Sequence, residues 1–416
     1  MEKIMVETSP PLKGKVRTSG AKNSALPILA ASLLGTEDII LEDVPNLKDI
    51  EVMCEVLTSL GAKVEILDKG IIKINSSNIN NYVTRYELMS KMRASFLVMG
   101  PLLTRLGKTK TSLPGGCAIG TRPIDLHLKG FKALGANINS DHGNISAYAE
   151  RLIGDKIYLD FPSVGATENI IMAAVLAEGE TIIDNAAMEP EIVDLASFLN
   201  KLGADIKGAG TSTIRVKGVK KLGGGVHSII PDRIEAGTFM VASAITGGDI
   251  IVENVITSHI KPVIAKLKEI GCQVIENGDS VRVIGTKNLK PTDIKTLPYP
   301  GFPTDMQAQF MTLMSLCKGT SVVIETVFEN RFMHVDELKR MGADIKIDGR
   351  SAIIQGVDNL TSAPVKASDL RAGAALVLAG LVADGVTEID NIYHIDRGYD
   401  GIEEKLSKLG AIIYRK

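Results

Sequence analysis

The chain has 416 residues, of which 45% are hydrophobic and 23% are charged, a composition typical of a folded protein of about two or three domains and not of a disordered one. Its 47 basic and 49 acidic residues nearly cancel, which argues against a general basic surface for nucleic acid or membrane but leaves a local cationic cavity open. The N-terminus lacks the apolar core of a secretory signal, no apolar run approaches the ~20 residues of a membrane span, and the four cysteines form no CxxC pair. We therefore expect a cytoplasmic protein without disulfides or structural zinc.

A short phrase recurs six times along the chain and predicts a repeated structural unit. The copies are SLGAKV (59–64), ALGANI (133–138), KLGADI (201–206), EIGCQV (269–274), MGADI (341–345) and KLGAII (408–413). Their glycines are 68 to 74 residues apart and stand at positions 61, 135, 203, 271, 342 and 410. Such a period indicates that one supersecondary module is repeated.

Each phrase closes an amphipathic helix and opens a strand. In the first and third copies the apolar residues share one helical face: Ile50, Met53, Cys54, Leu57 and Leu60, and Ile192, Leu195, Ala196, Leu199 and Leu202. Glycine just after a helix suits the left-handed C′ position. Upstream lies an Ala-rich helix, then a strand such as EDIILEDV or DIIVENV. The predicted unit is helix–strand–loop–helix–strand, and the fold class is α/β.

The two ends of the chain indicate how the units are divided between domains. The N-terminal IMVETSPPLKGKV (4–16) resembles IRVKGVKKLGGGV (214–226) at the end of unit three, whereas unit six stops soon after its last phrase. Residues 1 to about 20 should therefore complete unit six. We predict one domain over 22–229 and a second formed by 1–21 and 230–416, with crossings near 21 and 229.

The second unit contains the clearest departure from the repeat. Its segment TSLPGGCAIGTRPIDLHLKG (111–130) contains a glycine-rich loop that displays Cys117. An exposed free thiol is usually retained for its reactivity, although a long surface turn with an incidental cysteine is the simpler alternative. Cys54, Cys272 and Cys317 lie in apolar contexts and are expected in the core.

The start of the first helix in each unit supplies the other candidates. Helix N-termini favour anions, and cationic residues stand at or near these starts: Lys22, Arg93, Arg122, Arg331, Arg371 and Arg397. Asp305 and Asp369 lie in the same positions, where each could instead be a plain helix cap.

The sequence lacks the motifs of several common chemistries. There is no GxxxxGK[ST] phosphate loop and no HExxH zinc motif, and the six histidines are scattered, so neither a metal nor a cofactor is expected. His127 could pair with Cys117 as a base, but a structural or substrate-contacting histidine is the favoured interpretation. The chain has no Trp, which argues against a base-stacking platform for nucleic acid.

Longer segments resemble the UDP-N-acetylglucosamine 1-carboxyvinyltransferase family of enolpyruvyl transferases. They are SGAKNSALPILAASLL, LPGGCAIGTRPIDLH, FPTDMQAQFMTL, ETVFENRFMHV, SDLRAGAALVLAG and YHIDRGYDGIEEKLSKLGA. The resemblance implies an inside-out α/β barrel of two domains, each of three units with helices buried inside the sheets. It also implies enolpyruvyl transfer from phosphoenolpyruvate to the 3′-hydroxyl of UDP-N-acetylglucosamine, the committing step of peptidoglycan synthesis.

The resemblance also assigns roles to individual residues. Cys117 would deliver a proton to the donor's methylene carbon and react with fosfomycin, Asp305 would take the proton of the sugar hydroxyl, and Asp369 would aid proton movement or orient the arginines. Residues matching phosphoenolpyruvate contacts are Lys22, Asn23, Cys117, Arg122, Arg331, Arg371 and Arg397, with Lys22 and Arg397 counted as catalytic. Residues assigned to the nucleotide sugar are Asn23, Arg93, Arg122, Pro123, Ile124, Asp125, Leu126, His127, Ser163, Val164, Gly165, Asp305 and Val327. Some members have Lys where this chain has Phe161, so no cationic diphosphate contact is carried to that position.

Two alternatives stay open at this point. A 5-enolpyruvylshikimate-3-phosphate synthase shares the fold and the donor, but it lacks the cysteine loop, and its NAGTAMR motif is not found here. A catalytically inactive nucleotide-sugar-binding regulator would be expected to have lost Cys117 or Asp305, and both are present. The sequence does not determine the oligomeric state.

Overall fold

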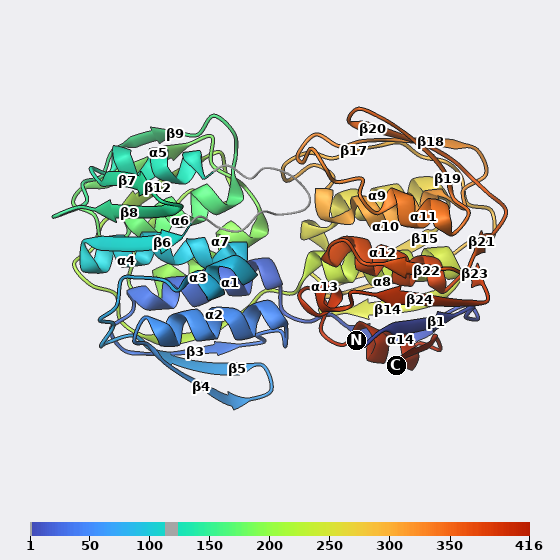
Figure 1. Cartoon of the computed structure of the whole chain (residues 1–416), viewed down its shortest axis with the longest axis horizontal. Coiled ribbons are helices and arrows are strands. Elements are labelled where there is room, and N and C mark those ends of the chain that lie inside the picture. Colours follow the sequence, from blue (N-terminus) through green and yellow to red (C-terminus); the bar gives the residue numbers. More distant parts are fainter. Residues whose placement is uncertain (1, 113–123) are drawn as a thin grey trace. The chain divides into compact units, whose positions relative to one another are not determined.

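The computed structural model describes residues 2–112 and 124–416, and Cys117, Arg122 and Pro123 lie outside these ranges. The described chain forms two compact units (Figure 1). Residues 20–112 and 124–230 form the unit that we call N-terminal, and residues 2–19 and 231–416 form the C-terminal unit.

The N-terminal unit contains three sheets of similar topology. In each, an outer strand or bridge runs parallel to its neighbour and the remaining strands are antiparallel. In spatial order the sheets are β13 (Gly225–Ser228), β3 (Asp38–Glu42), β5 (Ile71–Asn75) and β4 (Lys63–Asp68); β6 (Lys108–Ser112), β8 (Asn144–Tyr148) and β7 (Asn137–Asp141); and β9 (Lys156–Tyr158), β10 (Glu180–Asp184), β12 (Thr213–Lys217) and β11 (Asp205–Lys207). In the second sheet a single bridge between Val83 and Lys110 takes the place of the parallel strand.

The C-terminal unit repeats this topology in three four-stranded sheets. They are β2 (Lys13–Arg17), β14 (Asp249–Glu253), β16 (Ser280–Ile284) and β15 (Gln273–Asn277); β17 (Ile294–Lys295), β18 (Thr320–Ile324), β20 (Ser351–Gln355) and β19 (Asp344–Asp348); and β22 (Pro364–Lys366), β24 (Val386–Asp390), β1 (Ile4–Glu7) and β25 (Ile412–Arg415). A short pair, β21 (Leu360–Thr361) and β23 (Ala383–Asp384), lies beside them.

The first strand of the chain lies in the last of these sheets. Strand β1 runs antiparallel to both β24 and β25, with Ile4 opposite Ile389 and Arg415. The next strand, β2, runs parallel to β14, just as β13 runs parallel to β3 in the other unit. The two ends of the chain therefore complete one sheet together.

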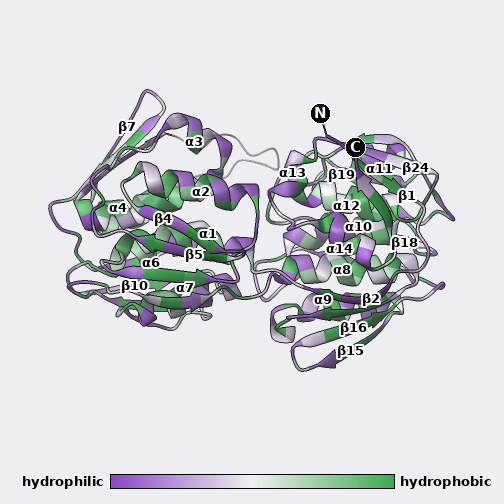
Figure 2. Ribbon diagram, turned by 90° about the horizontal axis from the view of Figure 1, so that it is seen from below, coloured by the Kyte–Doolittle hydropathy of each residue, from purple (hydrophilic) through white to green (hydrophobic). Residues whose placement is uncertain are grey.

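Each unit contains a set of apolar helices with little exposed surface. These helices are α1 (Lys22–Ala31), α4 (Met99–Leu106) and α6 (Val164–Ala174) in the N-terminal unit, and α8 (Arg233–Thr246), α10 (Gln307–Met314) and α12 (Leu370–Gly380) in the C-terminal unit. Every residue of α10, and every residue of α12 after Leu370, is buried. The ribbon coloured by hydropathy shows apolar residues along the inner helices and strands and hydrophilic residues on many outer loops (Figure 2). A helix that is apolar all round is expected only where other elements cover all its faces.

A second set of helices has one buried and one exposed face. It comprises α2 (Lys48–Ser59), α5 (Asp125–Ala133), α7 (Pro190–Lys201), α9 (Lys261–Ile270), α11 (Val335–Arg340) and α14 (Ile402–Lys408). Shorter helices are α3 (Tyr86–Lys91), α13 (Tyr393–Asp396) and the 3-10 turns Ser32–Leu34, Arg93–Val98, Thr257–His259 and Thr304–Met306.

The six repeated glycines lie just after these amphipathic helices, as predicted. Their φ angles are all positive, from 91° at Gly342 to 108° at Gly203 and Gly271. A side chain with a Cβ is strained in this region, whereas glycine is not. The predicted left-handed helix ends are therefore confirmed, and a strand follows each of them.

Candidate active site

The carboxylate of Asp305 lies between two buried guanidinium groups in the C-terminal unit. Arg331 Nη2 is 2.9 Å from Asp305 Oδ1, and Arg371 Nη2 and Nε are 3.0 and 3.2 Å from Oδ2. The arginine side chains are 4% and 2% exposed, whereas that of Asp305 is 26% exposed. The carboxylate is therefore fixed from its buried side by the two arginines, and the Asp305 side chain as a whole is partly exposed. Asp305 does not cap its helix with its side chain, so the simpler of its two sequence interpretations is wrong.

Asp369 is the N-cap of α12. Its Oδ1 accepts hydrogen bonds from the backbone N–H groups of Arg371, at 2.9 Å, and of Ala372, at 3.1 Å. A carboxylate in this position satisfies amide groups at the helix start and interacts favourably with the helix dipole. Asp369 thereby fixes the backbone from which Arg371 extends. One nitrogen of Arg371, Nη1, is buried and has no hydrogen-bond partner among the described residues.

Arg397 is the C-terminal boundary residue of the short helix α13. Burial lowers the pKa of the neighbouring His394, Arg397 lowers it further, and Asp369 acts in the opposite direction. The imidazole of His394 is therefore close enough to both groups to sense their charges. Among the predicted residues, this unit brings Asp305, Arg331, Arg371, Asp369 and Arg397 onto neighbouring helix ends and loops.

Buried Glu325 organises the loops on either side of Asp305. Its Oε1 accepts hydrogen bonds from Thr296 Oγ1 (2.8 Å), Val327 N (2.8 Å) and Phe328 N (3.2 Å). Its Oε2 accepts one from Thr304 Oγ1 at 2.9 Å. The predicted sugar contact at Val327 and the residue before Asp305 are thus tied to one carboxylate.

His334 is a buried histidine within FENRFMH. Burial lowers its pKa to about 4; the charge of Asp369 raises the pKa and that of Arg331 lowers it. The imidazole is therefore neutral near pH 7. It lies close enough to two predicted site residues to sense both.

In the N-terminal unit, Lys22 is the first residue of α1 and forms a buried ion pair. Its Nζ is 2.6 Å from Asp49 Oδ2, and the two side chains are only 9% and 2% exposed. Burying an ammonium group is costly unless it is paired. Asp49 therefore fixes where the Lys22 ammonium lies, and the adjacent Asn23 is exposed.

His127 on α5 has a protonation state that its neighbours determine. Asn169 Oδ1 accepts from Gly100 N (2.8 Å), so the amide nitrogen of Asn169 faces Phe96 O (3.1 Å) and His127 Nδ1 (3.1 Å). His127 Nδ1 must then be an acceptor, which leaves the ring proton on Nε2. Burial, and secondarily the charge of Arg93, lowers the His127 pKa to about 3. His127 is therefore a neutral donor near pH 7.

The starts of α5 and α6 meet at this histidine. Ser163 is the N-cap of α6, and its side chain accepts a hydrogen bond from Ala166 N. A Cβ on Gly165 would lie 3.3 to 3.4 Å from the His127 ring, so glycine allows the imidazole its close approach to the first turn. Among the predicted sugar contacts, Arg93, His127, Ser163, Val164 and Gly165 are gathered here. The start of α5 also holds Ile124, Asp125 and Leu126, and Phe161 is 44% exposed.

Four structural partners were missed in the sequence analysis: Asp49, Asn169, Glu325 and Tyr399. Glu325 and Tyr399 lie within the quoted segments ETVFENRFMHV and YHIDRGYDGIEEKLSKLGA, but nothing in the spacing singled them out, and Asn169 lies outside the quoted segments. No local signal marks Asp49, which contacts Lys22 through the packing of α1 and α2. The cysteines expected in the core are partly buried at Cys54 and buried at Cys272 and Cys317.

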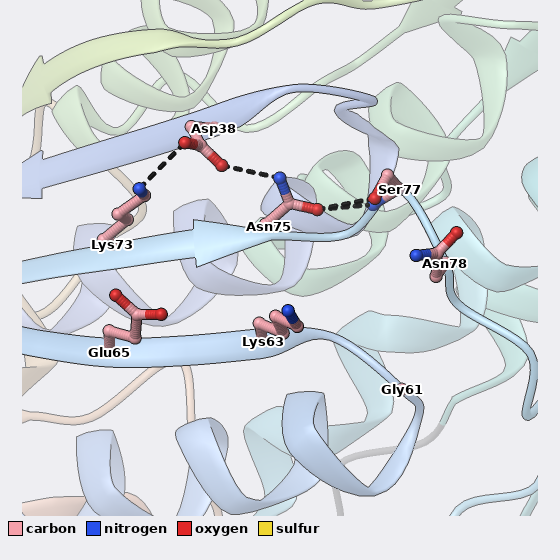
Figure 3. Close-up of a pocket in the computed structure, with 8 residues that line it drawn as sticks. All are labelled: Asp38, Gly61, Lys63, Glu65, Lys73, Asn75, Ser77 and Asn78. Atoms are coloured by element: carbon pink, nitrogen blue, oxygen red, sulfur yellow. Dashed lines mark hydrogen bonds and ion pairs between the residues drawn. The ribbon is translucent and has the colours of Figure 1, made fainter.

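A pocket of about 300 Å³ lies elsewhere in the N-terminal unit, on the sheet that contains β3, β5 and β4 (Figure 3). Its polar groups bind one another, since Asp38 accepts hydrogen bonds from Lys73 Nζ (2.9 Å) and Asn75 Nδ2 (2.6 Å). None of the predicted site residues that the structure describes lines this pocket. It is not the candidate site.

Within residues 2–112 and 124–416, no group of three or more His, Cys, Asp or Glu residues is arranged to hold a metal ion. The same ranges contain no helix of the length and apolar character that a membrane crossing requires.

Comparison with known proteins places the chain in a family. A model of EPSP synthase (3-phosphoshikimate 1-carboxyvinyltransferase) matches residues 6–406. UDP-N-acetylglucosamine 1-carboxyvinyltransferase of Finegoldia magna is 69% identical over 100% of this chain and 99% of the relative, and UDP-N-acetylglucosamine 1-carboxyvinyltransferase 1 of Caldanaerobacter subterraneus subsp. tengcongensis is 67% identical over the same shares. The chain belongs to the UDP-N-acetylglucosamine 1-carboxyvinyltransferase family.

Solved structures of other enolpyruvyl transferases share the fold of this family member. The enolpyruvyl transferase NikO from Streptomyces tendae has a TM-score of 0.91 at 24% identity, over 100% of this chain and 99% of that chain. EPSP synthase from Acinetobacter baumannii has a TM-score of 0.77 at 19% identity, over 100% of both chains. At these identities the likeness concerns the α/β fold alone.

Proposed function

We propose that the protein transfers the enolpyruvyl group of phosphoenolpyruvate to the 3′-hydroxyl of UDP-N-acetylglucosamine and releases phosphate. The structural observation that carries this proposal is the partly exposed carboxylate of Asp305, held by Arg331 and Arg371. In this arrangement a potential general base, Asp305, lies beside two cationic groups that could bind an anionic donor. Full-length relatives at 56–69% identity support this acceptor over shikimate 3-phosphate.

The roles of the individual residues form part of the proposal. Asp305 accepts the proton of the sugar hydroxyl as its oxygen attacks the donor, and Cys117 supplies a proton to the methylene carbon. In the resulting tetrahedral ketal the carbon–oxygen bond to phosphate breaks while the new methyl group gives up a proton, so phosphate leaves and the double bond of the enol ether forms again. Lys22, Arg122, Arg331, Arg371 and Arg397 bind the phosphate and carboxylate of the donor, with Asn23 beside Lys22. The buried Nη1 of Arg371, which has no hydrogen-bond partner within residues 2–112 and 124–416, is a donor that such an oxyanion suits.

The acceptor is proposed to bind the helix starts gathered around His127. A neutral Nε2–H at His127 and the first turn of α6 offer donors to the nucleotide sugar. Val327 and Asp305 contact the sugar from the loops that Glu325 holds.

The finer architecture is proposed in the same way. Six repeated units, three in each domain, form an inside-out barrel with the first helix of each unit inside the sheets. The domains are residues 22–229, which carry the Cys117 loop, and residues 1–21 with 230–416. The observed burial of α10 and α12 and the repeated sheet topology support this description. The reaction belongs to peptidoglycan synthesis, and hence to cell-wall formation, cell shape and division, and we place it in the cytoplasm.

Phosphate release tests the function. Purified protein is incubated with phosphoenolpyruvate and either UDP-N-acetylglucosamine or shikimate 3-phosphate, and each substrate is omitted in turn. We expect phosphate only with phosphoenolpyruvate and the nucleotide sugar together. Equal release with shikimate 3-phosphate would favour the EPSP synthase alternative, and binding of the nucleotide sugar without release would favour the inactive regulator.

Cys117 has a separate test. Intact-mass measurement with and without fosfomycin should show one adduct on the wild-type protein and none on Cys117→Ser. An adduct that persists in Cys117→Ser would assign the reactive thiol to another cysteine.

A further inference from the structure

Tyr399 is a buried tyrosine at the centre of a hydrogen-bond network beneath Asp305. It lies between α13 and α14 and is 3% exposed. Its hydroxyl oxygen is 3.0 Å from Thr238 Oγ1 on α8 and 3.2 Å from Gln309 Nε2 on α10. The guanidinium carbon of Arg371 on α12 lies over its ring, 5.4 Å from the centroid. Three buried helices therefore converge on one side chain.

The direction of each hydrogen bond follows from its neighbours. The Thr238 hydroxyl donates to Ile234 O at 2.8 Å, so Thr238 Oγ1 can only accept from Tyr399. The Tyr399 hydroxyl thus donates to Thr238 and accepts from Gln309. The amide of Gln309 is oriented independently, because its nitrogen also donates to the main-chain carbonyl of Asp305 at 3.0 Å.

These contacts close a ring around Asp305. On one side, Gln309 joins the Tyr399 hydroxyl to the Asp305 backbone. On the other side, Arg371 stacks on the Tyr399 ring and holds the Asp305 carboxylate. Gln309 Oε1 and Arg371 Nη1 have no hydrogen-bond partner among the described residues, but the bonds that Gln309 and Arg371 do make restrict how these side chains can move. Tyr399 contacts both arms of this ring, through Gln309 and through Arg371.

We propose that Tyr399 is a positioning residue for the reaction, which fixes Asp305 through Gln309 on the backbone side and through Arg371 on the carboxylate side. The inference rests on the proposed role of Asp305 as the group that takes the acceptor's proton. A base that is displaced by a fraction of an ångström loses rate more than it loses substrate affinity.

The test compares Tyr399→Phe with the wild type. Phenylalanine keeps the ring under Arg371 but removes the donor to Thr238 and one acceptor of Gln309, whose nitrogen keeps Thr238 Oγ1 at 3.2 Å and Asp305 O at 3.0 Å. We expect kcat to fall about tenfold while both KM values change by less than about threefold. Tyr399→Leu removes the ring as well, so its kcat should be lower than that of Tyr399→Phe.

Ser243→Ala is the matched control, since Ser243 is also on α8 and its buried hydroxyl donates to Val283 O at 2.7 Å. This variant removes a buried hydrogen bond that involves neither Asp305, Gln309 nor Tyr399, so it should lower the melting temperature about as much as Tyr399→Phe and keep kcat. Thr238→Val provides a second route if Tyr399→Phe does not fold, and it should lower kcat in the same direction. The proposal is overturned if kcat of Tyr399→Phe, or of Thr238→Val, falls no more than that of Ser243→Ala.

Asp305→Asn separates this inference from the proposed function. If Asp305→Asn retains wild-type kcat, the role of Asp305 is wrong and the proposal for Tyr399 falls with it. If Asp305→Asn is inactive while Tyr399→Phe keeps its kcat, only the positioning role is wrong.

Discussion

Arg371 holds one oxygen of the Asp305 carboxylate with two nitrogens of its guanidinium, Nη2 at 3.0 Å and Nε at 3.2 Å. Both of these nitrogens donate, and the arginine is almost completely buried, so the contact has little freedom to rearrange. The second oxygen faces Arg331. The position of Asp305 is therefore determined by helix α12 and by the loop that carries Arg331, as well as by its own turn.

Replacing Asp305 by Asn tests its chemical role. The amide has the shape of the carboxylate but neither its charge nor its basicity, and it faces two guanidinium groups. We expect kcat to fall by a factor of about 100 or more, which is within the usual range for loss of a general base. Steady-state kinetics of phosphate release measures this change.

The matched control is Asp249→Asn, because both carboxylate oxygens of Asp249 also accept hydrogen bonds from guanidinium nitrogens, here Nε and Nη2 of the single residue Arg282, at 2.8 and 2.6 Å. That pair is on the surface, with side chains 33% and 42% exposed. Asp249→Asn should keep kcat, and a comparable loss in both variants would indicate a general effect of breaking Asp–Arg pairs.

The buried pair of Lys22 and Asp49 allows the effect of a substitution on stability to be distinguished from its effect on activity. Asp49→Leu leaves the Lys22 ammonium buried without this carboxylate, which should cost about 3 kcal/mol of stability and raise the KM for phosphoenolpyruvate. The double variant Lys22→Met/Asp49→Leu should recover most of the melting temperature but remain inactive. Thermal unfolding and kinetics on the three proteins test this, and recovery of activity in the double variant would contradict a role of Lys22 in binding the donor.

Glu325 is not assigned to contact the nucleotide sugar, but replacing it should weaken the binding of that substrate. Glu325→Ala removes the acceptor of four hydrogen bonds around residues 296, 304, 327 and 328, so the loop that carries Val327 should loosen. We expect the KM for UDP-N-acetylglucosamine to rise about tenfold or more, whereas Glu325→Gln, which keeps one carbonyl oxygen, should lie closer to the wild type. Equal KM values in Ala and Gln variants would show that the hydrogen bonds are not what holds the loop.

His127 predicts a pH dependence of stability. Its pKa falls from 6.5 to about 3 on folding, so between these values the unfolded chain binds a proton that the folded one does not. The stability contributed by the neutral imidazole is thus present above about pH 6.5 and lost as the pH falls towards 3, by about 1 kcal/mol per pH unit. Replacing His127 by Gln should therefore flatten the decline in unfolding free energy between pH 6.5 and 5.

The control for this prediction is His142→Gln, whose side chain is 91% exposed. It should leave the pH dependence of stability unchanged. A decline as steep in His127→Gln as in the wild type would mean that His127 takes up its proton in the folded state.

The repeat made much of the fold predictable from sequence. The glycines at 61, 203 and 410, with their three counterparts, predicted helix ends because a positive φ is a local demand that only one residue type meets without strain. The α/β class followed from the alternation of helix and strand. The exact strand neighbours, such as β1 between β24 and β25, depend on pairings hundreds of residues apart. Only the resemblance of residues 4–16 to residues 214–226 indicated that the N-terminal segment completes the last unit.

The site was predictable where function requires a particular residue type in a recognisable segment. Asp305, Arg331 and Arg371 were found in this way, and the structure brings them together. The partners of Lys22, His127 and Arg371 were not predicted. Asp49, Asn169 and Tyr399 reach these residues through packing between separate helices, which no sequence pattern specifies. The tautomer of His127 likewise depends on how Gly100 and Phe96 orient Asn169, which no sequence pattern contains.

The most direct test of enolpyruvyl transfer is the mass of the acceptor after the reaction. UDP-N-acetylglucosamine is incubated with phosphoenolpyruvate and wild-type protein, Asp305→Asn or Asp249→Asn, and the nucleotide sugars are analysed by mass spectrometry. We predict that the wild-type protein and Asp249→Asn convert the acceptor to a species heavier by one enolpyruvyl group and release one phosphate for each acceptor converted. Asp305→Asn should form almost none of this species. An unchanged acceptor in the presence of folded wild-type protein and both substrates would contradict it.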